Sequence, residues 1–281
     1  MRFLHFILSH SIFIACCAMG LCYQTNTILH MPHNTNLYGF VFFSTICSYN
    51  FYWLLSKFYF SDRIFNALFF KNNLSFISMF LIAAAVSVFF LFHIQYLLPH
   101  ILIAVFLTVL YSLPLWPYSV LKKLQKLGFF KTILLSFTWA FITTVLPASH
   151  MLQEDISPMA VLFAARFCFM LLLCIIFDRR DISVDKLHGL RSLATDLPQQ
   201  KLTVIIHIVF VLYFVMGLFL RFYFNDKPQM FAFLITGAIV WSVYNLSLKK
   251  RGYLFYYFLV DGLMLISALG TFIASLFSKT V

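Results

Sequence analysis

Charged residues are scarce in this chain. Asp, Glu, Lys and Arg together make up 10% of its 281 residues, whereas an ordinary soluble domain has about 25%. Hydrophobic residues make up 62%, and the mean hydropathy is +0.92. No water-soluble fold can hide so large a share of apolar side chains, so the composition excludes a soluble protein and predicts several membrane-crossing segments.

The apolar segments also lack the alternation of polar and apolar residues that a transmembrane β-barrel requires. Backbone groups cannot stay unpaired in lipid, so long unbroken apolar runs indicate helices. We therefore predict an all-α polytopic membrane protein with nine transmembrane helices. Their approximate ranges are 3–23, 37–57, 74–94, 97–115, 130–149, 157–177, 201–222, 229–247 and 253–277.

Signs of any further domain are absent. The six cysteines have the spacing of neither a disulfide framework nor a zinc site. The first apolar run resembles a signal peptide but is long and has no clear cleavage site, so we interpret it as a span. With no linker and no low-complexity tract, residues 1–281 are predicted to form a single integral membrane domain.

Acidic residues are the scarcest charges: nine, against 20 Lys and Arg. With the N-terminus in the cytoplasm, sixteen basic residues fall on the cytoplasmic side and three on the other, and Arg166 lies within a span. The positive-inside rule favours this orientation. We interpret the net charge of +11 as a topology signal and not as a nucleic-acid surface. The expected location is the plasma (inner) membrane, with the N-terminus cytoplasmic.

A third of the acids nevertheless lie in one run of eight residues, inside the stretch FDRRDISVDKLHGLRSLAT at residues 177–195. If the helix before it continues, Asp178, Asp181 and Asp185 lie within roughly 60° of one another on one face. Converging carboxylates repel, and Mg²⁺ shared with substrate phosphates would compensate them. The alternative is a solvated, salt-bridged stretch at the membrane surface. The loop is expected to be cytoplasmic.

This D-x-x-D-x-x-x-D pattern, followed by Gly189-Leu190-Arg191-Ser192-Leu193-Ala194, resembles the second aspartate-rich motif of the UbiA superfamily of intramembrane prenyltransferases. Ser192 stands where that family usually has Thr. Further similarities run from Leu110-Tyr111-Ser112-x-Pro114 to Asp261-Gly262. Nine spans also match the family, so the resemblance covers most of the chain.

The resemblance implies a UbiA-like bundle that transfers an isoprenyl group from a prenyl diphosphate to an acceptor, with Mg²⁺, in the membrane. Asp178, Asp181 and Asp185 would be the catalytic metal ligands. Metal ions and cationic side chains would stabilise the charge that develops on the leaving diphosphate. The candidates for binding the diphosphate are Lys122, Lys123, Lys126, Lys131 and Arg179. The acceptor and the prenyl length are left open, and membrane lipid is the other expected partner.

The first aspartate-rich motif of the family is degenerate here. Asn50 takes its Asn position, but Phe51, Leu54 and Phe58 occupy the three aspartate positions. This departure favours an alternative function, a degenerate UbiA-like protein that binds lipid or a partner without turnover. A small transporter is a weaker option, because few charges lie within spans.

Polar residues inside spans need partners. Asn50 is either a ligand in the cavity or an interhelical hydrogen-bonding group. Arg166 lies near the middle of its span and is a candidate cavity residue that binds substrate, or half of a structural pair with Asp261.

Overall fold

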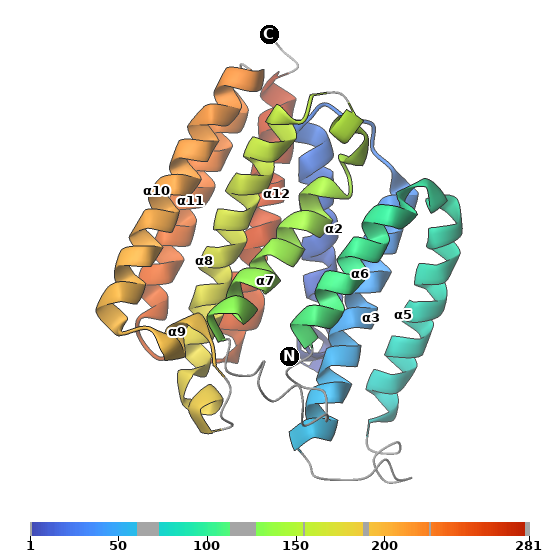
Figure 1. Ribbon diagram of the computed structural model, residues 1–281, viewed down its shortest axis with the longest axis vertical. Coiled ribbons are helices and arrows are strands. Elements are labelled where there is room, and N and C mark those ends of the chain that lie inside the picture. The colour runs from blue at the N-terminus through green and yellow to red at the C-terminus, as the bar shows by residue number, and fades with distance from the viewer. Residues whose placement is uncertain are drawn as a thin grey trace. The chain divides into compact units, whose positions relative to one another are not determined.

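The structure is a computed structural model that describes residues 2–60, 73–112, 128–153, 155–187, 191–224 and 226–278; in these ranges every regular element is helical (Figure 1). Six helices are long and apolar enough to cross a membrane, and a bent helix pair makes a seventh if it counts as one span. The protein is therefore an all-helical, multi-pass membrane protein.

Each of the nine predicted segments lies mostly on helical residues where the structure describes it. Three of them are outside the set of six, namely the first segment, α3 (Thr35–Phe60) and α7 (Gly128–Ala140), so the count of nine spans stays a prediction. The first segment is broken. Helices α1 (Arg2–Ser9) and α2 (Ile12–Ile28) meet at 64°, and Ser11 between them has φ 64°.

The described chain divides into two compact units, and each is considered by itself. The first holds residues 2–19, 34–60 and 73–112, and the second holds residues 20–33 and 128–278 apart from the gaps above. Helix α2 contributes to both. The single domain predicted from the sequence stays a prediction.

The first unit is built on α3 packed against α5 (Leu74–His93), with α6 (Leu98–Ser112) following a short 3₁₀ turn, Gln95–Leu97. Ala15, Ile46 and Ala83 form its small buried core. Gly39 lets the two helices approach closely, because a Cβ there would stand 2.5 Å from the Phe90 ring. Large apolar side chains elsewhere on α5 and α6 are exposed, as expected of surfaces that face lipid.

The second unit carries the aspartate cluster. Its helices after α7 are α8 (Ser157–Leu187), α9 (Leu193–Asp196), α10 (Gln199–Phe224), α11 (Lys227–Ser247) and α12 (Asp261–Ser278). Two π-helical turns, Phe141–Val145 and Phe255–Val260, adjoin α7 and α12, and Ser149–Gln153 is a 3₁₀ turn. Helix α8 packs against α7 and α10, and α11 packs against α10 and α12 (Figure 1).

Helix α8 is the central helix of this unit. Residues 168–176 are all buried, which means that neighbours cover the helix on every side there. The buried run leads without a break into Phe177 and Asp178. The first aspartate, Asp178, therefore lies at the point where α8 leaves the buried apolar core of the unit.

Candidate functional site

The helix that carries the aspartates continues past the apolar segment. Helix α8 runs for 31 residues to Leu187, so Asp178, Asp181 and Asp185 all lie on one regular helix. This is the continuation on which the prediction of a common face was conditional. The stretch predicted as a loop between the sixth and seventh spans is thus mostly a helical extension, with short α9 after it.

Asp178 is held from α7. Thr132 Oγ1 donates a hydrogen bond to Asp178 Oδ2 at 2.5 Å, and the Leu193 N–H donates to Thr132 Oγ1 at 3.2 Å. Lys131 lies close enough to Asp178 for its charge to act on the carboxylate. Because α7 begins at Gly128, its first turn places a cation and a hydroxyl beside the acid.

Asp181 is held by its neighbour in sequence. Arg180 Nε and Nη2 donate to the two oxygens of Asp181, each at 2.7 Å. The guanidinium carbon of Arg180 also lies 4.9, 5.1 and 4.8 Å from the ring centres of Phe177, Tyr256 and Tyr257. Charge-assisted bidentate bonds and cation–π contacts together fix Arg180 in place. The middle carboxylate is therefore compensated by the protein itself.

Asp185 is the most buried acid of the three, with 8% of its surface exposed. Its charge acts on Asp178, two helical turns earlier. No group of three or more His, Cys, Asp or Glu side chains is arranged to hold a metal in the part of the chain that the structure describes. Asp178 and Asp185 are thus close enough for their charges to interact, whereas Asp181 is paired with Arg180.

Arg179 faces a different helix. Its Nη1 donates to the Tyr244 hydroxyl of α11 at 3.2 Å, and its guanidinium carbon lies 5.7 Å from the centre of that ring. Consecutive residues on a helix point about 100° apart, so Arg179 and Arg180 reach different neighbours. Both cations flank the aspartates, but only Arg180 pairs with one.

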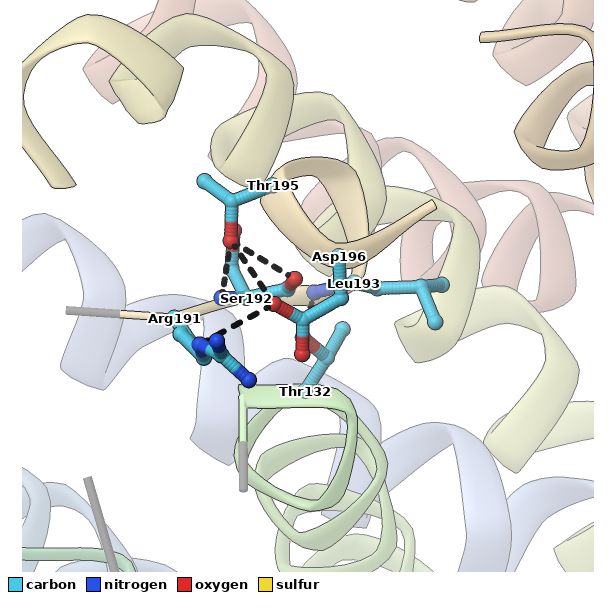
Figure 2. Close-up of polar contacts among 6 residues, drawn as sticks. All are labelled: Thr132, Arg191, Ser192, Leu193, Thr195 and Asp196. Carbon is cyan, nitrogen blue, oxygen red and sulfur yellow. Dashed lines mark hydrogen bonds and ion pairs between the residues drawn. The ribbon is translucent and has the colours of Figure 1, made fainter. Parts of the chain in front are cut away.

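The second half of the motif forms the start of α9 (Figure 2). The Ser192 N–H donates to Thr195 Oγ1 at 2.7 Å, and the Thr195 hydroxyl donates to the Ser192 carbonyl at 3.0 Å. Arg191 Nε lies 3.8 Å from Asp196 Oδ1. The Leu193 N–H bond to Thr132 then attaches this short helix to α7, beside Asp178. Gly189 and Leu190 lie outside the described residues.

Arg166 is buried in the first third of α8, near the middle of the predicted span 157–177, with 3% of its surface exposed. Its Nη2 donates to the Leu21 carbonyl of α2 at 3.5 Å. The pairing with Asp261 considered from the sequence stays a prediction; Arg180 is a cation whose charge acts on Asp261. Arg180 lies near the C-terminal end of α8, so at least one charge that reaches Asp261 comes from the aspartate-rich part of that helix.

Asn50 belongs to the first unit. Its Nδ2 donates to the His10 carbonyl at 3.1 Å and to the Ile46 carbonyl at 2.8 Å, which joins α3 to the bend after α1. This is the interhelical alternative for Asn50. Its role as a substrate ligand stays a prediction. Lys122, Lys123 and Lys126 lie outside the described residues.

Sequence reasoning missed Thr132, Tyr256 and Tyr257 as members of the site. Thr132 follows Lys131, which was singled out for its charge, but a lone threonine in an apolar run carries no signal of its own. The two tyrosines stand in a π-helical turn, a feature often found at functional sites. Their cluster with Tyr253 was the available signal.

Compared with known proteins, the chain matches no protein-family model, no curated protein and no solved structure. The residues of the site are therefore the basis for a proposed function.

Proposed function

We propose that the protein is a UbiA-like prenyltransferase that moves an isoprenyl group from a prenyl diphosphate to an acceptor within the membrane. The observation that carries the proposal is the unbroken course of α8 from a buried apolar core to Asp178, Asp181 and Asp185. An allylic diphosphate is divided in the same way as α8, because its apolar chain is joined to a strongly charged anionic head. The acceptor is left open.

The donor set fits Mg²⁺ in kind. Magnesium is usually bound by one or two carboxylates together with phosphate oxygens and water, so it does not need three protein ligands. Asp178 and Asp185 would be the ligands, and Asp181 would join them only on leaving Arg180. When bound, the ion would stabilise negative charge on the departing diphosphate.

The other residues of the site would position the diphosphate. Thr132 fixes the orientation of Asp178, and Lys131 supplies a positive charge next to it. Arg179 and Arg180 add two cations on the following turn, and Lys122, Lys123 and Lys126 remain candidates from the sequence. The rings of Phe177, Tyr256 and Tyr257 would hold Arg180 at the charged end through their cation–π contacts. We place this end at the cytoplasmic face of the plasma membrane.

A second candidate is a protein that binds a prenyl lipid without turnover. It is favoured by Arg180, which occupies both oxygens of Asp181, and by the apolar residues at the aspartate positions of the first motif. An internal cation compensates one carboxylate without a metal. Such a site would bind an anionic lipid head but lack the metal that drives its departure.

The test is thermal unfolding of the detergent-purified protein with farnesyl or geranylgeranyl diphosphate, with and without Mg²⁺. A ligand specific to the folded state adds about 2.7 kcal/mol of stability at a hundred times its dissociation constant. The variants are Asp178→Asn and Asp185→Asn, with Asp196→Asn as a matched control on α9. Release of diphosphate on adding candidate acceptors would then be measured.

The outcomes separate the two candidates. A magnesium-dependent rise in melting temperature that both α8 variants lose and the control keeps supports prenyl transfer. A rise that is indifferent to Mg²⁺, with no diphosphate released, supports binding without turnover. No stabilisation by either lipid contradicts both.

A further inference from the structure

A serine and a histidine from two parts of the first unit form a short hydrogen bond. Ser75 Oγ and His10 Nε2 lie 2.6 Å apart. Ser75 is the second residue of α5, and His10 directly follows the last residue of α1. A hydroxyl within about 2.6–3.2 Å of a base is the arrangement that nucleophilic catalysis requires when a third group orients the base. The surroundings of the pair were therefore followed outward from the imidazole.

The partners of the second ring nitrogen fix where the imidazole carries its hydrogen. His10 Nδ1 lies 3.1 Å from the Phe6 carbonyl and 3.0 Å from Ser9 Oγ, and the Ser9 hydroxyl itself donates to that carbonyl. A carbonyl oxygen can only accept, so Nδ1 carries the hydrogen and donates it on this side. His10 Nε2 then presents its lone pair to Ser75, whose hydroxyl donates to it. This is the protonation state of a general base.

The imidazole ring of His10 is held on both faces. It stacks against the rings of Phe6 and Phe76, whose centres lie 4.2 and 4.5 Å from its own, and 7% of the residue is exposed. Trp53 stacks in turn on Phe76 at 3.8 Å, and Asn50 Nδ2 donates to the His10 carbonyl. Aromatic faces stabilise a cation. The same rings would therefore stabilise the imidazolium that forms when His10 takes a proton.

The nucleophile of the pair is accessible from outside, whereas the base is buried. Ser75 is exposed, and its neighbour Leu74 is 66% exposed. Ser75 stands at the end of a 20-residue apolar helix that is long enough to cross a membrane. This position is near the boundary between hydrocarbon and headgroups, where the ester bonds of glycerolipids lie. A lipid ester can therefore reach Ser75 from the membrane without entering a cavity.

The start of α5 can stabilise the oxyanion that an attack by Ser75 would produce. The N–H groups of Phe76 and Ile77 both donate to the Asn73 carbonyl. The N–H groups of Leu74 and Ser75 have no partner inside the helix, because they precede its first turn of bonds. The N–H of the nucleophile itself is part of the oxyanion hole in chymotrypsin-like enzymes. The positive end of the helix adds to this stabilisation.

We infer that Ser75 and His10 are a nucleophile and its general base, and that they cleave a carboxylic ester of a membrane lipid. Ser75 Oγ attacks the carbonyl carbon while His10 Nε2 takes the hydroxyl proton. The C–O bond of the ester then breaks, and the alcohol leaves with that proton. Water, activated by His10 in the same way, releases the carboxylic acid and restores the hydroxyl of Ser75. This activity does not depend on prenyl transfer, since it needs neither the aspartates nor magnesium.

The test uses the full-length protein in detergent and a fluorophosphonate, a reagent that phosphonylates activated serines. Mass spectrometry of peptides locates the adduct, and hydrolysis is measured as release of oleic acid from micelles that contain dioleoyl phosphatidylglycerol. The variants are Ser75→Ala and His10→Gln. Ser78→Ala is the matched control, because Ser78 is exposed one turn further along α5 and its hydroxyl donates to the Ser75 carbonyl and not to an imidazole.

We expect an adduct on Ser75 in the parent protein and in Ser78→Ala, and release of oleic acid that Ser75→Ala abolishes. His10→Gln should slow both reactions by roughly 100-fold. No adduct on Ser75, as much adduct on Ser78, or equal labelling in His10→Gln would overturn the inference. An adduct on Ser75 without release of oleic acid would overturn the lipid ester as substrate. If His10→Gln does not fold, the position of the adduct in the parent protein and the loss of hydrolysis in Ser75→Ala decide.

Discussion

At the scale of single residues, Thr132 connects three parts of the site through one hydroxyl. It donates to Asp178 and accepts from the Leu193 N–H. Replacing it by valine keeps the shape but leaves a half-buried carboxylate and a buried N–H without this partner. We expect Thr132→Val to lower the free energy of unfolding by about 1–3 kcal/mol, measured by denaturation in detergent. Thr132→Ser keeps the hydroxyl and should stay near the parent; equal losses in both would show that the methyl group matters and not the bonds.

Gly237 allows the close approach of α10 and α11. A Cβ at this position would stand 2.6 Å from Phe214 Cε1 and 2.9 Å from Tyr213 Cε1. We expect Gly237→Ala to cost about 1–3 kcal/mol of stability, because both rings must shift. Gly252→Ala is the control, since nothing lies within 4 Å of a Cβ there. If the two variants unfold alike, the rings adapt freely and the close packing is not needed.

At the scale of elements, the bend between α1 and α2 depends on an unusual backbone conformation. Ser11 has φ 64°, a left-handed region that costs roughly 1–2 kcal/mol for a residue with a Cβ. We expect Ser11→Gly to raise the free energy of unfolding by about 1 kcal/mol and Ser11→Val to lower it, measured in the same assay. A loss of stability in the glycine variant would mean that the serine side chain stabilises the bend.

The helices were predictable because each is a long apolar run, and in lipid the backbone N–H and C=O groups of such a run must hydrogen-bond within a helix. The extension of α8 was predictable from the spacing of Asp178, Asp181 and Asp185, which suits a helix. The bend at Ser11 was not, because serine has no preference for a left-handed conformation. The partners of the charged residues were not predictable either. Arg180 and Asp181 are adjacent in sequence and pair with each other, and the rings of a distant π-helical turn hold Arg180 in this position.

At the scale of the whole molecule, α8 ends at Leu187, and α11 begins at Lys227 after one crossing by α10. Both residues are exposed. In a variant whose six cysteines are alanine, we expect Leu187→Cys to react with an impermeant maleimide from the cytoplasmic side and Lys227→Cys from the other. Labelling of intact and inverted vesicles measures this. Reversed labelling would invert the orientation, and labelling of both from one side would mean that α10 does not cross.

The length of α8 has a consequence for how molecules arrive. Its 31 residues extend about 46 Å, whereas the hydrocarbon of a bilayer is about 30 Å thick. The charged last third therefore stands among headgroups and water, about 18 Å along the axis from Arg166. One helix thus extends from the hydrocarbon of the bilayer into the water. In the proposed prenyl transfer, an oily reactant would enter sideways from the bilayer and a hydrophilic one would approach from the water, so that neither would leave the phase in which it dissolves.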